Sequence, residues 1–161
     1  WVLPNGDEGP WNTRVIYAPW GHANHDVEPA DDANGRRWTA PGYDDSNWQQ
    51  TQGPFYRNNG NWPDDDSRYY VRRKFVVSDL SDIKSIRLWV NHDDNATVYL
   101  NGILVADCPH AHSCEYLLPK ELLSQGVNII CANVYQGGGY AYIDLGLRAS
   151  DETGPAVANK L

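Results

Sequence analysis

Residues 87–107, RLWVNHDDNATVYLNGILVAD, decide the fold of this chain. Apolar and polar residues alternate before the pair Asn101-Gly102, with Ala96, Val98 and Leu100 on one face, and an apolar run through Ile103 and Val105 follows the pair. Alternation of this kind is typical of half-buried strands. Asn-Gly between two such segments favours a tight hairpin, because both residues tolerate a positive φ. The stretch therefore predicts two antiparallel strands joined by a two-residue turn.

The same alternation extends through the second half of the chain. It predicts further strands in YYVRRKFVV (69–77), SIRLWVN (85–91), CEYLL (114–118), VNIICANVY (127–135) and YAYIDLGLRA (140–149). In 85–91, Ile86, Leu88 and Val90 share one face, with Arg87 and Trp89 on the other. Only LPKELLSQG (118–126) resembles a helix, of one or two turns. Many short strands separated by turn residues predict an all-β fold, an antiparallel β-sandwich.

The first half of the chain carries weaker signals. RVIYA (14–18) is a candidate strand, but 21–50 is rich in Gly, Pro, Asn and Asp and is expected to be mostly loop. We expect a single β-sandwich domain over 1–150, with an irregular N-terminal part over 1–40, and a linker or tail over 151–161. Because the chain starts at Trp1 without a methionine, we interpret it as a mature form or a piece of a longer protein.

Composition narrows the range of partners. The formal net charge is −8 and the sequence pI is about 4.9, which argues against nucleic acid and anionic membrane surfaces as partners. No apolar run approaches the length of a membrane span. Seven Trp and ten Tyr accompany only two Phe, and Trp and Tyr suit wet binding surfaces as well as cores. Of the Trp residues, we expect Trp38, Trp48 and Trp89 to serve packing.

Strand direction predicts where the loops lie. If successive strands alternate in direction, the segments NHDDNA, DCPHAHSC, QGGG and GPFYRNNGNWPDDDSR all reach the same end of the sandwich. The tight connections then lie at the opposite end. This elaborate end is the expected binding surface.

Three stretches together resemble a known family: YYVRRKFVV, HDDNATVYLNG and GVNIICANVYQGGGYAYIDLGL. They are similar to the galactose-binding-like jelly rolls of secreted polysaccharide-degrading enzymes, and YDDSNWQQTQGPF resembles the matching N-terminal strand pattern. The likeness covers roughly residues 41–148. It implies a jelly-roll sandwich that acts as a carbohydrate-binding module or braces a catalytic domain. It also aligns Asp144 with a position that can bind a structural calcium ion, and a strand cap is the alternative.

Two short motifs have competing interpretations. His92-Asp93-Asp94 has the groups for acid–base or metal chemistry, but a strand-to-strand corner in which Asp side chains accept backbone N–H groups is the favoured hypothesis. In CPHAHSC, a disulfide between Cys108 and Cys114 is simpler than zinc, because the loop lacks zinc-finger spacing. Cys131 is expected to point into the core.

The sequence therefore predicts a non-catalytic carbohydrate-binding module of an extracellular multidomain protein. The alternatives are a structural domain that packs on a neighbouring catalytic domain, and a small glycan hydrolase using Asp93 or Asp94. The expected partners are an oligosaccharide or polysaccharide and that catalytic domain, with no required cofactor. The expected sugar-binding residues are Tyr56, Arg57, Asn59, Trp62, His92, Asp94, His110, His112, Tyr135, Gln136 and Tyr140.

Overall fold

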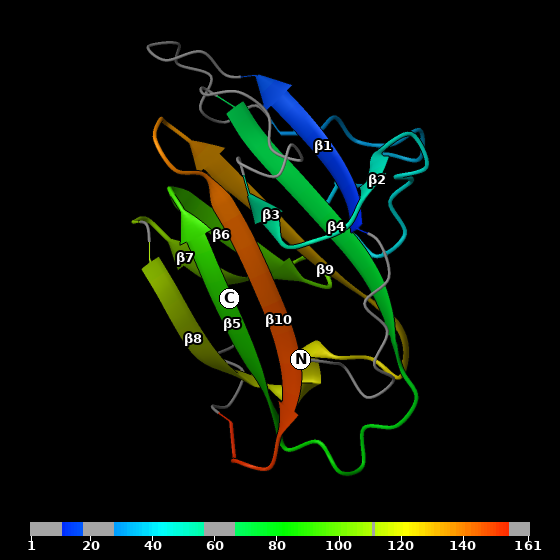
Figure 1. Ribbon diagram of the computed structural model, residues 1–161. Coiled ribbons are helices and arrows are strands. Elements are labelled where there is room, and N and C mark those ends of the chain that lie inside the picture. The colour runs from blue at the N-terminus through cyan, green and yellow to red at the C-terminus, as the bar shows by residue number, and fades with distance from the viewer. Residues whose placement is uncertain (1–10, 18–27, 57–66, 111, 155–161) are drawn as a thin grey trace, which may run out of the picture.

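The computed structural model describes residues 11–17, 28–56, 67–110 and 112–154, which form two facing antiparallel sheets (Figure 1). The larger sheet has the spatial order β2 (Gln49–Thr51), β1 (Trp11–Tyr17), β4 (Ser67–Val77), β9 (Gly126–Gln136), β6 (Asn95–Leu100) and β7 (Ile103–Cys108). The smaller sheet has the order β3 (Phe55–Tyr56), β10 (Tyr142–Ser150), β5 (Ser85–Asp93) and β8 (His112–Pro119). The predicted all-β sandwich is confirmed, and the short helical segment is a single 3-10 turn at Lys120–Leu122.

The main core fills the space between the two sheets. Ile86, Leu88 and Val90 of β5 have no exposed surface and face Val98 and Ala132 of the larger sheet. Burial follows the alternation of the sequence, because successive strand side chains point to opposite faces. Figure 1 shows the strands of the smaller sheet in front of those of the larger sheet, and the buried apolar cluster packs between the two.

The predicted hairpin is present between β6 and β7. Leu100 pairs with Ile103, and the turn residues Asn101 and Gly102 have φ of 51° and 85°. The Asn101 side chain also accepts a hydrogen bond from the backbone N–H of Ile129, at 2.9 Å. The turn is thus tied to the neighbouring strand β9 rather than free at the surface.

A second core lies on the outer face of the larger sheet. Residues 28–48 contain no strand or helix, yet Trp38 and Trp48 are buried there, as the sequence predicts. They pack with Tyr43 against Tyr70 of β4 and against β9. The indole of Trp38 meets the ring of Tyr70 edge-on, with 5.0 Å between centroids. An irregular segment therefore covers a sheet face by inserting aromatic rings.

A buried ion pair fixes this segment to β4. The Arg72 guanidinium has no exposed surface, and its Nε donates to Oδ2 of Asp45 at 2.9 Å. It lies 4.9 Å from the ring centroid of Tyr43 and also donates to the carbonyl oxygen of Ala40. Cys131 is buried in the same layer, as predicted, and burial raises the pKa of its thiol to about 12.

Candidate functional site

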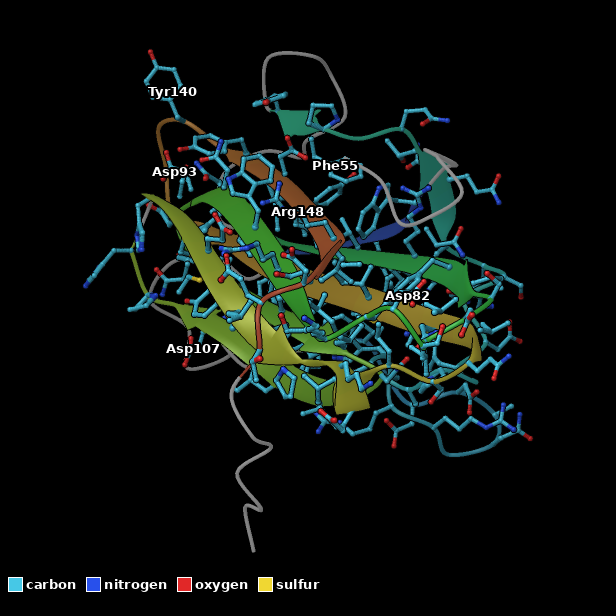
Figure 2. All side chains as sticks on the ribbon, turned by 90° about the horizontal axis from the view of Figure 1, so that it is seen from below. Phe55, Asp82, Asp93, Asp107, Tyr140 and Arg148 are labelled. Carbon is cyan, nitrogen blue, oxygen red and sulfur yellow. The ribbon has the colours of Figure 1, made fainter. Side chains whose placement is uncertain are left out.

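The elaborate connections meet at one end of the sandwich. The link from β5 to β6, the chain after β7 and the loop from β9 to β10 all leave strands that pair there: Asp93 lies opposite Tyr142, and Asn95 opposite Tyr135. We call residues 94, 109–110 and 137–141 the loop rim. Figure 2 shows Asp93, Asp107 and Tyr140 on the opposite side of the molecule from Asp82, which lies in the turn from β4 to β5. The prediction that these three connections share one end is confirmed, and most of the fourth predicted segment, GPFYRNNGNWPDDDSR, lies outside the described residues.

Several predicted sugar-binding residues are accessible on or beside the loop rim. Tyr140 is 76% exposed, and Figure 2 shows it projecting away from the sheets. His110 and His112 are exposed. Tyr56 is 37% exposed, with its ring centroid 6.1 Å from that of Tyr142. Arg57, Asn59 and Trp62 lie outside the described residues.

The structure corrects two of the predicted contacts. His92 and Gln136 have no exposed surface, so neither side chain can touch a glycan. His92 continues the inward series of Ile86, Leu88 and Val90 on β5, which directs it between the sheets. Gln136 ends β9, which is flanked by β4 and β6.

Two more predicted residues help to build the rim. Oδ2 of Asp94 accepts the backbone N–H of Gly137 at 2.8 Å, so the predicted strand-to-strand corner is confirmed for this residue. Burial, with a hydrogen bond to Asp94, raises the pKa of Asp93. Tyr135 is half-buried, with the Arg68 guanidinium 5.4 Å from its ring centroid.

A groove of about 490 Å³ lies elsewhere, on the outer face of the smaller sheet. Its floor comes from β5, β8 and β10, and its wall from 52–55 and Trp11. Trp89 lies in this groove and is 39% exposed, so its predicted packing role is wrong. Trp89 pairs with Gly146 on β10, and because glycine has no side chain, that neighbour leaves the indole uncovered. The signal was present in the sequence: a residue between Leu88 and Val90 must point outward.

Charged groups surround Trp89 in the groove. Arg87 donates to Glu115 at 2.5 Å and also to Glu152 beyond the end of β10. Arg148 of β10 pairs with Arg87 of β5, and Figure 2 shows Arg148 on the outer face of the smaller sheet. Burial raises the pKa of Asp144, which lines the groove. The calcium ion predicted at Asp144 stays a prediction.

The cysteine loop brings its two sulfurs together. Cys108 and Cys114 are free thiols with 3.1 Å between their Sγ atoms, so the predicted disulfide stays a prediction. Burial raises the pKa of Cys108 to about 11. Burial also lowers the pKa of His92, which lies beside them.

The fold and these surfaces define an antiparallel β-sandwich domain with a groove on one sheet and a rim of loops at one end. No family model and no curated protein matches the sequence. The part of the chain that the structure describes contains no helix with the length and apolar character of a membrane span.

Solved structures of glycoside hydrolases share the fold. A calcium-binding mutant of Bacteroides uniformis β-glucuronidase 2 matches with a TM-score of 0.58 and 16% identity, over 86% of this chain and 17% of that chain. A glycosyl hydrolase family 2 member from Bacteroides cellulosilyticus gives 0.54 and 15%, over 86% and 20%. A β-glycosidase from Bacteroides vulgatus gives 0.53 and 18%, over 85% and 19%. The chain therefore spans about a fifth of the length of these enzymes and shares a β-sandwich fold with part of each.

Proposed function

We propose that this chain is a non-catalytic carbohydrate-binding domain of an extracellular, multidomain, glycan-degrading protein. The observation that carries the proposal is Trp89, a half-exposed indole on a rigid strand in a groove with charged walls. The likeness to parts of glycoside hydrolases supports a glycan-degrading context.

The groove suits a pyranose ring. The C–H face of a sugar stacks on an indole and removes apolar surface from water, while its hydroxyls need directed donors and acceptors. Asp144 and Arg148 of β10 supply such groups in the groove, on the strand that pairs with β5, which carries Trp89. Arg87 is held by Glu115 and Glu152, so its guanidinium is already oriented before a ligand arrives.

Replacing Trp89 with alanine tests this assignment. A Trp side chain presents roughly 250 Å² in all, so its 39% exposed fraction is about 100 Å². Covering that area at about 25 cal/mol/Å² contributes at most about 2.5 kcal/mol. A glycan array should first identify a ligand for the 161-residue chain. Calorimetry should then show that Trp89→Ala raises Kd by about 10- to 60-fold.

Tyr140→Ala is the matched control, because it removes an exposed aromatic ring from the loop rim. It should change Kd by less than about threefold if the groove is the site. Loss of binding in Tyr140→Ala but not in Trp89→Ala would move the site to the rim and contradict the groove assignment.

A second candidate function is a bracing domain that packs on a catalytic domain without binding glycan. Val76 and Val127 favour it, because they pair across β4 and β9 and are 50% and 58% exposed. Failure of the chain to bind any glycan, together with a stable complex with the parent's catalytic domain, would select this function instead.

A further inference from the structure

Three potential metal ligands meet at the edge where the two sheets approach each other. They are His92 of β5, Cys108 of β7 and Cys114 of β8, and their ligand atoms all lie within 4.8 Å of one another. β7 ends the order of the larger sheet and β8 that of the smaller sheet. The cluster therefore joins the sheets at one side of the sandwich.

The orientation of His92 is fixed by the backbone. Nδ1 lies 2.7 Å from the carbonyl oxygen of Asp94. A carbonyl can only accept, so Nδ1 carries the ring proton and Nε2 has a free lone pair. His92 is fully buried, and Nε2 has no hydrogen-bond partner among the described residues.

A buried acceptor without a partner is costly, and most such atoms in native proteins are satisfied. Metal-ligating histidines usually donate their other N–H to a carbonyl or carboxylate, which fixes the tautomer. His92 has this arrangement, and its ring offers a ligand nitrogen within 4.8 Å of the sulfurs of Cys108 and Cys114. The free lone pair and the two sulfurs are independent observations that indicate the same class of ligand.

We propose that His92, Cys108 and Cys114 form a binding site for a zinc-like divalent cation. Two thiolates and one imidazole are ligands that Zn²⁺ prefers, with one position left for solvent. Zn–S bonds of about 2.3 Å in a tetrahedron place two sulfurs about 3.8 Å apart. The Sγ atoms, now 3.1 Å apart, need to separate by less than about 1 Å.

Binding of the cation releases protons and involves no change in oxidation state. The cation replaces the thiol protons of Cys108 and Cys114, which pass to solvent, and no electron is transferred. A disulfide between the same sulfurs needs an oxidant to accept two electrons, and it removes both ligands. The two states exclude each other, so the metal site belongs to the reduced chain.

This site goes beyond the proposed glycan function. The groove lies on the outer face of the smaller sheet, whereas the cluster faces inward from β5 and β7. A cation held by both sheets stabilises the fold, because it binds the folded chain in preference to the unfolded one.

The test uses the reduced 161-residue chain, freed of metal with a chelator and titrated with Zn²⁺ or Co²⁺. We expect one Zn²⁺ per chain, a higher melting temperature, and a Co²⁺ complex with thiolate charge-transfer bands and tetrahedral d–d bands. Cys114→Ser changes a half-buried ligand and should weaken Zn²⁺ binding by at least about 100-fold.

His110→Ala is the matched control, because His110 is an exposed imidazole in the same loop. It should bind Zn²⁺ as tightly as the unmodified chain does. The Co²⁺ spectrum of the unmodified chain tests thiolate ligation without depending on how any variant folds. The proposal is overturned if the reduced chain binds no Zn²⁺, if its Co²⁺ complex lacks thiolate bands, or if folded Cys114→Ser binds equally well.

Discussion

Replacing the buried Asp45 with asparagine should lower the free energy of unfolding more than a conservative substitution of an exposed residue does. Asp45 is 6% exposed and accepts from Nε of Arg72 at 2.9 Å, while Nζ of Lys74 lies 3.4 Å away. The Arg72 guanidinium has no exposed surface. Asparagine keeps the shape of the side chain but leaves the buried guanidinium without its counter-charge.

The magnitude follows from the burial of the pair. Removing one partner of a buried ion pair costs about 3–5 kcal/mol, because the remaining charge stays desolvated. Arg72 keeps its contacts with the carbonyl oxygen of Ala40 and the ring of Tyr43. An asparagine oxygen can still accept from Nε, so we expect a loss near the lower limit, about 3 kcal/mol. For a chain of this size that corresponds to a melting temperature lower by about 6–12 °C.

Denaturant unfolding of both chains at pH 7 measures the difference in the free energy of unfolding. Asp44→Asn is the matched control, because Asp44 is the adjacent residue and is exposed. Its carboxylate accepts the backbone N–H of Ser46, which an asparagine oxygen can also do. Asp44→Asn should change stability by less than about 0.5 kcal/mol.

The same pair predicts a pH dependence. Burial favours the protonated form of Asp45, but hydrogen bonds from Arg72 and Asn12 outweigh burial and lower its pKa. A lowered folded pKa means that the stabilisation is fully present above the unfolded value of about 3.9 and is lost as the pH falls through the folded pKa. The advantage of the wild-type chain over Asp45→Asn should be constant from pH 8 to about pH 5 and shrink below about pH 4. A difference under about 1 kcal/mol at pH 7, or one that does not shrink in acid, would refute the reasoning.

Two further predictions concern other buried polar groups. Asn128 is fully buried and donates to the carbonyl oxygens of Ser124 and Gly126. Asn128→Ala should therefore lower the free energy of unfolding, measured by urea titration, by about 2–4 kcal/mol. A loss below about 1 kcal/mol would show that solvent replaces these bonds. Because burial raises the pKa of Cys131 to about 12, iodoacetamide at pH 8 should modify Cys114 in the reduced folded chain and reach Cys131 only after unfolding, as peptide mass mapping can check. Rapid labelling of Cys131 in the folded chain would contradict its place in the second core.

Local patterns in the sequence predicted the strands of the second half and the shared end of their loops, but not the short strands β2 and β3. The alternation of Ile86, Leu88 and Val90 predicted which side of β5 is buried, and Asn101-Gly102 predicted the hairpin. Both depend on neighbours within a few residues, because the period of a strand and the φ of a turn are local properties. The common end of the loops followed from the assumption that successive strands alternate in direction, although only β6 and β7 among β5 to β10 form a hairpin and the other connections cross between the sheets.

Long-range packing decided what local patterns could not. The sequence does not show that 28–48 folds back onto the larger sheet, where Asp45 meets Arg72 at a separation of 27 residues. Nor does it show that Trp89 faces an open groove, since an outward indole can be covered by any other part of the chain.

The cluster of His92, Cys108 and Cys114 is the clearest example of a feature that only long-range packing decides. Within CPHAHSC a disulfide between Cys108 and Cys114 was favoured, because the cysteines and histidines of this loop lack zinc-finger spacing. His92 comes from a different strand, and its burial and the orientation of its ring depend on how β5 packs against β7 and β8. Sequence by itself determined the longer strands of the second half and the inward face of β5 at Ile86, Leu88 and Val90. Only the tertiary structure decided which side chains meet, because contacts between sheets depend on how two twisted surfaces pack and not on the residues adjacent along the chain.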